Sequence, residues 1–217
     1  MKPAAFFFDL DGTLIDTEQV WAKAIVAALR DFGEEAGEDS ILRLVLGRSW
    51  LDIHAAVQDA FPRVPKMPAA EAAAKLRPYY QRLATDPSSM VIRSSVDFLK
   101  KAVHIAPCAI VSGSPHADVE SAAEICGVSG LLSFVLGAED YGRGKPAPDG
   151  YLKAATMLDV DASECVVVED SAAGVRAGRA AGMRVIGLRR QSAVPQDLSG
   201  CEWLVEDLSE LNPDVAF

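Results

Sequence analysis

The sequence predicts an α/β fold, in which helices cover both faces of a parallel sheet and an all-helical segment is inserted after the first strand. Short apolar runs recur along the chain, helical patterns separate them, and residues 17–89 contain helical patterns without a convincing strand. Strands that alternate with helices are typical of parallel sheets. We therefore expect a core formed by residues 1–16 and 90–217, and a helical cap formed by residues 17–89.

The predicted strands are short continuous apolar runs, a pattern typical of strands that are buried on both faces. They are Ala5–Phe8, Ala109–Val111, Phe134–Leu136, Val166–Val168 and Val185–Leu188. Small or polar residues follow most of them. Ligands bind at the carboxyl ends of the strands in such sheets, so we expect these polar residues to meet at one edge.

The predicted helices fall into two groups. Those of the core are Val96–Val103, Pro115–Cys126 after a cap-like Ser114, Tyr151–Leu158, and Ala172–Ala181 after a cap-like Asp170 or Ser171. Those of the insertion are Val20–Phe32, Ser40–Leu46, Trp50–Phe61 and Ala69–Leu83, with breaks at Gly33, Gly47 and 62–68. We expect the insertion to act as a lid that is hinged near Asp16 and near residues 86–89.

The overall composition is acidic. The 217 residues carry a formal net charge of -10, which disfavours nucleic acid and acidic membranes as partners because both attract basic surfaces. A small phosphorylated metabolite remains compatible with this charge if positive groups gather locally. No apolar stretch approaches the roughly 20 residues of a membrane helix. We expect a monomer without membrane contact.

The four cysteines indicate a reducing compartment. Cys108, Cys126, Cys165 and Cys201 are far apart, form no Cys-x-x-Cys pair and lie in or beside apolar stretches. Buried free thiols explain this pattern better than disulfides or zinc ligands do. The apolar run that ends at Phe8 is too short for the core of a signal peptide. These observations predict a cytoplasmic protein.

Two carboxylates follow the first predicted strand. Asp9 and Asp11 are two residues apart, so in extended backbone both side chains can face the same side. One carboxylate can attack phosphorus, forming an aspartyl-phosphate, while the other transfers a proton. Gly12 lets the chain turn away, and N–H groups around Leu10 can face the phosphoryl group. Alone, such a pair is as easily explained as solvated or capping acids.

Three other strand ends supply complementary groups. Ser112 and Gly113 offer a hydroxyl and N–H donors at a helix start, which suit a phosphate oxygen. Lys145 lies in a proline-stiffened loop as a point charge. Glu169 and Asp170 follow a buried strand, and their carboxylates can share a hard cation with the first strand end. Magnesium is the expected cation because it prefers oxygen ligands and bridges to phosphate.

These four segments, in this order, resemble the haloacid dehalogenase superfamily, and specifically its subfamily with a helical cap after the first motif. That subfamily contains beta-phosphoglucomutases, phosphoglycolate phosphatases and sugar phosphatases. The resemblance covers nearly the whole chain and implies a Rossmann-like core.

The resemblance also implies a role for each motif residue. Asp9 matches the family nucleophile, Asp11 the general acid/base, Thr13 the closing hydroxyl of the first motif, and Ser112 and Lys145 the second and third motifs. The implied magnesium ligands are the Asp9 carboxylate, the Asp11 main-chain carbonyl and Asp170. Glu169 either coordinates the ion or lies just behind these ligands.

The acid at Asp11 favours phosphoryl transfer over dehalogenation, since a displaced halide needs no proton. We expect a phosphatase acting on a small phosphate monoester such as a sugar phosphate, with a beta-phosphoglucomutase-like mutase as the alternative. The mutases carry a histidine where this chain has Trp21, and their arginine after the cap glycine is displaced here, with Arg48 in that region. Both departures favour hydrolysis.

Three further residues are candidate substrate contacts. Trp21, like Trp50, either lines the substrate chamber or packs in a core at helical spacing. Arg48 either reaches the substrate or is a solvated surface arginine. His116 lies at a helix start near the second motif.

Two other classes of protein fit the sequence less well. A signalling receiver also has an acidic pocket with a phosphorylated aspartate, but the helical insertion and Asp11 argue against it. A catalytically silent binding protein has no motivating feature, because no motif residue is missing.

Overall fold

The computed structural model describes residues 2–46, 48, 50–190 and 196–214. The predicted break at Gly47 lies outside these residues. The described chain divides into two compact units. Residues 2–16, 90–190 and 196–214 form the first, here called the sheet unit, and residues 17–46, 48 and 50–89 form the second, the helical unit.

The sheet unit is built on a parallel sheet whose six described strands have the order β3-β2-β1-β4-β5-β6. The strands are β1 (Ala5–Phe8), β2 (Cys108–Val111), β3 (Phe134–Leu136), β4 (Cys165–Glu169), β5 (Arg184–Leu188) and β6 (Trp203–Val205). In the register of the central strands, Phe8 lies opposite Ile110 of β2 and Val168 of β4. The carboxyl ends of β1, β2 and β4 are therefore adjacent at one edge.

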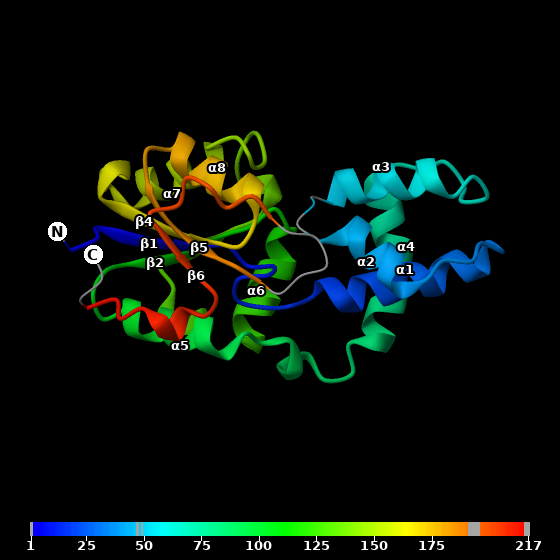
Figure 1. Ribbon diagram of the computed structural model, residues 1–217, viewed down its shortest axis with the longest axis horizontal. Coiled ribbons are helices and arrows are strands. Elements are labelled where there is room, and N and C mark those ends of the chain that lie inside the picture. Colours follow the sequence, from blue (N-terminus) through cyan, green and yellow to red (C-terminus); the bar gives the residue numbers. More distant parts are fainter. Residues whose placement is uncertain (1, 47, 49, 191–195, 215–217) are drawn as a thin grey trace. The chain divides into compact units, whose positions relative to one another are not determined.

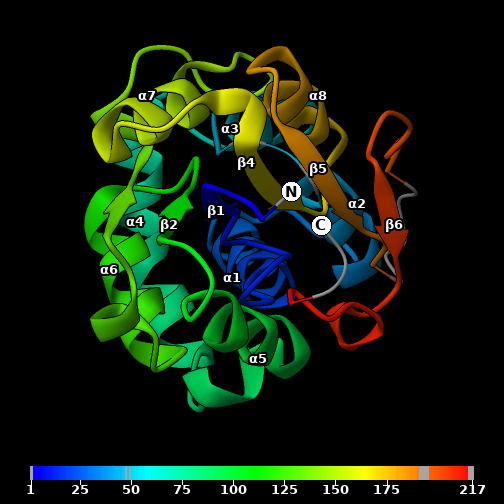
Figure 2. The same cartoon turned by 90° about the vertical axis from the view of Figure 1, so that its left-hand side faces the viewer.

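The described α-helices of the sheet unit are α5 (Arg93–Ala102), α6 (His116–Ile125), α7 (Asp149–Leu158) and α8 (Ala172–Ala180). Its short 3-10 helices are η2 (Ser129–Leu131), η3 (Ala138–Asp140), η4 (Ala162–Glu164) and η5 (Leu208–Glu210), and a further one, η1 (Pro87–Met90), lies at the junction with the helical unit. Figures 1 and 2 show α7 and α8 on one face of the sheet and α5 and α6 on the other. The α/β fold predicted from the sequence is thus confirmed.

The strand β1 shows how this sandwich is packed. Phe6, Phe7 and Phe8 are all fully buried, and successive side chains of a strand point to opposite faces. Phe6 and Phe8 pack edge-on against Phe98 of α5, with ring centroids 6.1 and 6.2 Å from it. Phe7 belongs to the apolar cluster on the other face, which includes Tyr151 of α7. An uninterrupted apolar run is therefore needed at this position.

Some details differ from the sequence predictions. Strand β6 was not predicted. Helix α7 begins at Asp149 rather than Tyr151. Ser114 does not cap α6, whose N-cap is Pro115, because the Ser114 hydroxyl is bonded to another part of the chain. Ser171 does cap α8, accepting a hydrogen bond from the N–H of Gly174 at 3.0 Å.

The cysteines are free, as predicted. Cys108, Cys126 and Cys165 are buried and Cys201 is half-buried. Among the described residues, no helix has both the length and the apolar character needed to cross a membrane.

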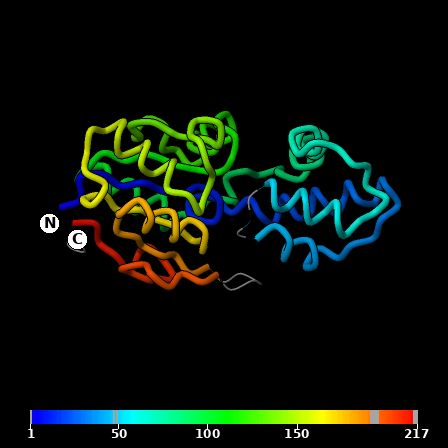
Figure 3. Tube along the Cα trace, turned by 90° about the horizontal axis from the view of Figure 1, so that it is seen from above, coloured from blue at the N-terminus to red at the C-terminus, as the bar shows by residue number. Residues whose placement is uncertain are grey.

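The helical unit consists of α1 (Glu18–Asp31), α2 (Glu38–Val45), α3 (Trp50–Ala60) and α4 (Ala69–Leu83). Figure 3 traces these helices in blue and cyan. Helix α1 packs against both α2 and α4. The core of the unit is formed by Ala22, Ile25, Val26, Leu29, Ile41, Val45 and Ile53. Their spacing along α1 matches one face of a helix, which is why this segment is readily recognised in the sequence.

The chain segments that lead to and from the helical unit are paired within the sheet unit. Ile15 and Val91 form an antiparallel bridge. The N–H of Asp16 donates to the carbonyl of Met90 at 2.8 Å, and the N–H of Ile92 donates to that of Leu14 at 2.9 Å. These bonds hold the two connections side by side.

Candidate active site

The site begins where β1 ends. Asp9 remains close to the sheet, because its N–H donates to the carbonyl of Val168 at 3.0 Å, and the residue is 8% exposed. The chain then turns sharply at Gly12, whose φ of +85° favours glycine. A Cβ at Gly12 would also lie 2.1 Å from Oδ2 of Asp170. A glycine is therefore required here by both the turn and its neighbour.

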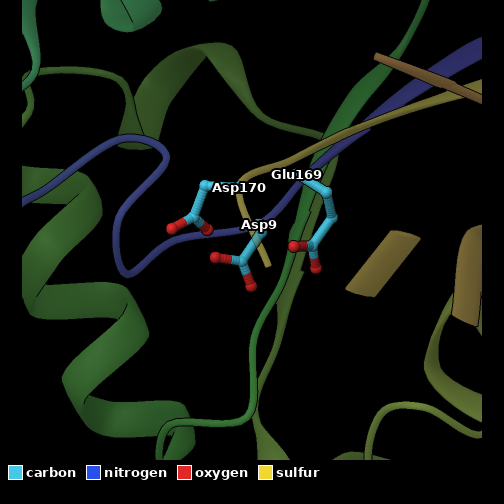
Figure 4. Close-up of side chains that lie close together, drawn as sticks. All are labelled: Asp9, Glu169 and Asp170. Atoms are coloured by element: carbon cyan, nitrogen blue, oxygen red, sulfur yellow. The ribbon is translucent and has the colours of Figure 1, made fainter. Parts of the chain in front are cut away.

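Three buried carboxylates meet at this edge of the sheet. Oxygens of Asp9, Glu169 and Asp170 lie within 4.8 Å of one another. Figure 4 shows Asp9 between the other two, one of which comes from the end of β4 and the other from the residue after it. The sequence predicted that these acids would come together. The atoms of this cluster that could coordinate a metal ion are all carboxylate oxygens, which hard divalent cations prefer.

Lys145 joins two of these carboxylates. Its Nζ donates to Asp9, to Oε1 of Glu169 at 2.6 Å and to the carbonyl of Val111 at 3.1 Å. Burial acts to lower the pKa of Lys145, but the charges of Asp9 and Glu169 outweigh it and raise the pKa well above its usual value. The lysine is thus a fixed positive charge in an otherwise acidic protein.

Glu169 is the most enclosed of the three acids. It is fully buried, and its Oε1 also accepts a hydrogen bond from the hydroxyl of Tyr151 at 2.9 Å. Its Oε2 accepts from the N–H and the hydroxyl of Ser171 at 3.1 and 3.0 Å. A Cβ at Gly174 would lie 1.7 Å from Oε1. Four donors and a glycine thus fix the position of this carboxylate.

Asp11 has a different partner. The hydroxyl of Ser114 donates to its Oδ2 at 2.7 Å, and the N–H of Ser114 donates to Oγ of Ser112 at 3.0 Å. The hydroxyl of Tyr141 donates to the carbonyl of Ser112 at 2.7 Å. The loop after β2 therefore orients Asp11 as well as offering groups of its own.

The net charge of the cluster shapes its chemistry. The pKa of Asp9 is raised to about 8, chiefly by burial and also by the charges of Glu169 and Asp11, although Lys145 acts to lower it. Three buried carboxylates with a single lysine form a site that a bound cation would stabilise. Such a cation would lower the pKa of Asp9 and favour its ionised, nucleophilic form. The residues present therefore fit a divalent metal ion.

The remaining predicted phosphate contacts lie around this cluster. Thr13 is fully buried, and its hydroxyl donates to Oδ1 of Asp170 at 3.3 Å. The carbonyl of Leu10 accepts the N–H groups of Thr13 and Leu14 at 3.2 and 2.8 Å, which closes the turn. A Cβ placed on Gly113 would meet no atom of the described chain within 4 Å.

Two of the three candidate substrate contacts, Trp21 and His116, have side-chain partners within their own units. Trp21 stacks on Tyr80, with ring centroids 4.3 Å apart. Arg48 is exposed. The His116 ring is bonded to Asp140, and its Nε2 lies 3.5 Å from a carboxylate oxygen of Glu120. Their roles toward substrate stay predictions.

Two polar partners of the site were not predicted as such. Tyr151 falls within a predicted helix, and the pattern around Ser114 predicts a helix cap. Both contacts span different elements, since Ser114 is 103 residues from Asp11 and Tyr151 is 18 residues from Glu169. Local sequence patterns carry no signal for such a contact.

Helices cover both faces of the parallel sheet, and a cluster of carboxylates lies at the carboxyl ends of its strands. This arrangement is typical of α/β enzymes that bind a cation at that edge. A sequence model of the haloacid dehalogenase-like hydrolases matches residues 3–182. The chain belongs to the haloacid dehalogenase-like hydrolase family, as its motifs suggested.

Individual relatives agree with this assignment. The chain is 32% identical over 207 residues to validoxylamine A 7'-phosphate phosphatase from Streptomyces hygroscopicus subsp. limoneus, with 94% of this chain and 93% of the relative covered. It is 31% identical over 207 residues to hexitol phosphatase A from Escherichia coli (strain K12), covering 90% and 88%. A similar solved structure is a HAD family hydrolase from Deinococcus radiodurans R1 with bound phosphate and sodium, at 25% identity, TM-score 0.73 and coverage of 98% and 95%.

Proposed function

We propose that this protein is a magnesium-dependent phosphatase that hydrolyses a small phosphate monoester, such as a sugar phosphate, through an aspartyl-phosphate on Asp9. The observation that carries the proposal is the buried cluster of Asp9, Glu169 and Asp170 with Lys145 bonded to two of its members. The enzyme is a hydrolase of phosphoric monoesters, the class to which the phosphatases among its relatives belong.

The proposed reaction has two steps. The Asp9 carboxylate attacks phosphorus in line while Asp11 protonates the leaving alcohol oxygen. Asp11 then takes a proton from the water that attacks phosphorus of the aspartyl-phosphate, which releases phosphate and regenerates Asp9. The hydrogen bond from Ser114 holds the Asp11 carboxylate in place for both transfers.

Positive charge must compensate the phosphate in an acidic protein. Lys145 supplies one fixed charge, while the hydroxyls of Ser112 and Thr13 and the N–H groups of Leu10 and Gly113 supply hydrogen bonds. Magnesium, held by Asp9, Asp170 and the Asp11 carbonyl, would supply further charge neutralisation when bound. Glu169 is bonded to Lys145, Tyr151 and Ser171. We place it behind the metal ligands, where it orients Lys145 rather than coordinating the magnesium ion.

The helical unit is proposed to be a cap that excludes water and selects the alcohol part of the substrate, through residues such as Trp21 and Arg48. The relatives named as a hexitol phosphatase and as a phosphatase of validoxylamine A 7'-phosphate favour a polyhydroxylated substrate. The alternative is a beta-phosphoglucomutase-like mutase, because that reaction uses the same aspartyl-phosphate. His116 is proposed as a further substrate contact.

The test is phosphate release from a panel of sugar, hexitol and glycolate phosphates, with and without magnesium. Asp97 offers a matched control, since it is an exposed aspartate on α5. We expect Asp9→Asn to lower kcat/KM by about 10⁴-fold or more, because the nucleophile is removed, and Asp97→Asn to leave it unchanged. EDTA should abolish turnover, and added magnesium should restore it.

Turnover by folded Asp9→Asn at the wild-type rate would contradict the proposal, as would full activity in EDTA. The same panel includes an assay of glucose-1-phosphate isomerisation. Isomerisation faster than phosphate release would assign the protein to the mutases instead.

A further inference from the structure

Tyr141, which directly follows η3, lies beside the loop after β2. Its hydroxyl donates to the main-chain carbonyl of Ser112 at 2.7 Å. Its ring is half-buried and packs against the apolar cluster that includes Val111. A Cβ placed on Gly150 of α7 would lie 3.1 Å from the ring carbons Cε1 and Cζ. The lack of a side chain at Gly150 therefore leaves room for the ring in this position.

The hydroxyl of Tyr141 keeps its proton, so it remains a hydrogen-bond donor. Burial raises its pKa above the ordinary value of 10.0, and the positive charge of Lys145, which acts to lower the pKa, does not cancel this effect. The nearby carboxylates of Asp9 and Glu169 raise the pKa further. The hydrogen bond to Ser112 is therefore present at neutral pH and well above it.

This bond acts on a peptide group that also carries a proposed phosphate contact. The carbonyl of Ser112 and the N–H of Gly113 belong to one planar trans peptide, in which they point in opposite directions. Because Tyr141 holds the carbonyl, the N–H is directed away from Tyr141. No described residue accepts this N–H, and a Cβ on Gly113 would meet no described atom within 4 Å. An oxygen of a bound phosphate can therefore reach it.

The backbone just before this peptide is fixed as well. The N–H of Ser112 donates to the carbonyl of Leu136 at 3.0 Å, and Nζ of Lys145 donates to the carbonyl of Val111 at 3.1 Å. Neither bond restrains the next peptide plane, which can still rotate about the single bonds on its two sides. The hydroxyl of Tyr141 supplies that restraint.

We propose that Tyr141 is a positioning residue, which directs the N–H of Gly113 toward a phosphate oxygen of the substrate by holding the carbonyl of Ser112. This role rests on the proposed phosphatase function. A hydrogen bond accepted by the carbonyl also polarises the peptide and strengthens its N–H as a donor. Donors that are already in position stabilise the charge that develops on the phosphoryl oxygens in the transition state, and a donor that must first reorient stabilises it less.

The substitution Tyr141→Phe removes the hydroxyl and keeps the ring. Loss of a whole donor of this kind lowers kcat by about 10²–10³-fold, so we expect misdirection of one donor to lower kcat/KM by about tenfold. The Kd of inorganic phosphate, measured with magnesium present, should rise roughly fivefold. The Kd of magnesium, measured by calorimetry without phosphate, should stay unchanged, because the hydroxyl is bonded to the loop after β2 and not to the acidic cluster.

The NMR signal of the Gly113 amide gives a readout that does not depend on turnover. Added phosphate should shift this signal in the wild-type protein and shift it less in Tyr141→Phe. The control is Tyr79→Phe, which removes a hydroxyl bonded to Asp31 in the helical unit and should change neither phosphate affinity nor the Gly113 signal. If Tyr141→Phe fails to fold, Gly150→Ala decides, because its Cβ presses on the same ring and should also weaken phosphate binding.

A Tyr141→Phe protein with wild-type phosphate affinity and a wild-type Gly113 response would overturn the inference. So would equal losses of phosphate and magnesium affinity, which would indicate a general loosening of the site. Wild-type protein that binds phosphate at Gly113 but hydrolyses no ester would contradict the proposed function alone, whereas normal turnover by Tyr141→Phe would contradict the role of Tyr141 alone.

Discussion

Oε1 of Glu169 receives two buried donors, the hydroxyl of Tyr151 and the ammonium of Lys145. Tyr151 is 1% exposed and Glu169 is fully buried, so neither can replace the other with water. Hydrogen bonds to charged groups are stronger than neutral ones, and a buried charge that loses a donor is destabilised. Tyr151 therefore acts on Lys145 and Asp9 through Glu169, as a positioning residue.

The substitution Tyr151→Phe removes that hydroxyl and keeps the ring. We expect the free energy of unfolding to fall by about 1.5–3 kcal/mol, because a buried carboxylate loses a hydrogen-bond donor. We also expect the magnesium concentration for half-maximal activity to rise roughly several-fold, as it does when other residues that hold metal ligands are replaced. Urea unfolding and magnesium titrations measure the two effects. Tyr79→Phe, which removes a more exposed hydroxyl bonded to Asp31, is the control, and equal effects of both substitutions would refute the role of Tyr151.

Gly12 is a second residue whose identity is dictated by its surroundings. Gly12→Ala would put a side chain on a residue with φ of +85° and drive a Cβ to 2.1 Å from Oδ2 of Asp170. We expect a loss of about 1–3 kcal/mol in stability and a fall in kcat of about 100-fold, comparable to other small displacements in active sites.

Thermal unfolding and steady-state kinetics measure both effects of the Gly12 substitution. The control is Gly130→Ala, at a position where a Cβ meets no atom within 4 Å. A Gly12→Ala enzyme with wild-type kcat would show that Asp170 can move without harm.

At the scale of elements, the sequence predicted five of the six described strands, β1 to β5, because their apolar runs are continuous. It missed β6, a three-residue strand at the sheet edge in which Leu204 is 42% exposed. Such a strand has no apolar pattern that distinguishes it from a loop. Likewise Ser114 looked like a helix cap, and only the folded sheet brings its hydroxyl to Asp11.

The start of α6 carries an interaction that depends on pH. A hydrogen bond to Asp140 raises the pKa of His116, and nearby Glu120 adds to the shift. Burial alone would raise the pKa of Asp140, but hydrogen bonds from His116 and the Gly137 N–H lower it. The pair is therefore fully formed only where Asp140 has lost its proton and His116 retains one.

Because the pKa of His116 is raised in the folded protein, its contribution to stability is present below the unfolded pKa of 6.5 and is lost as pH rises through the folded value. We expect His116→Gln to cost about 0.5 kcal/mol at pH 5.5 and less at pH 9, as for a partly exposed ion pair. Urea unfolding at the two pH values measures this. A cost that is equal at both pH values would show that protonation of His116 adds nothing.

Over the whole molecule, a single sheet edge gathers groups that are remote in sequence. Lys145 is 136 residues from Asp9, and the chain between them includes the whole helical unit. The four motif segments were predicted from the sequence, because each follows or adjoins an apolar run. Their detailed hydrogen bonds could not be predicted, since they depend on the strand order that places β1 between β2 and β4.

The central claim is that Asp9 accepts the phosphoryl group and that Asp11 activates the water that removes it. An aryl phosphate such as para-nitrophenyl phosphate leaves without needing a proton, so Asp11→Asn should still form the phosphoenzyme but hydrolyse it slowly. The measurement is the burst of nitrophenol released by Asp11→Asn with magnesium, followed by acid quenching and mass spectrometry of its peptides.

The account predicts a burst of one nitrophenol per enzyme molecule, with one phosphoryl group on the peptide that contains Asp9, and no burst from the Asp9→Asn, Asp11→Asn double variant. A burst that leaves the phosphoryl group on another residue, or a double variant that gives the same burst, would contradict it.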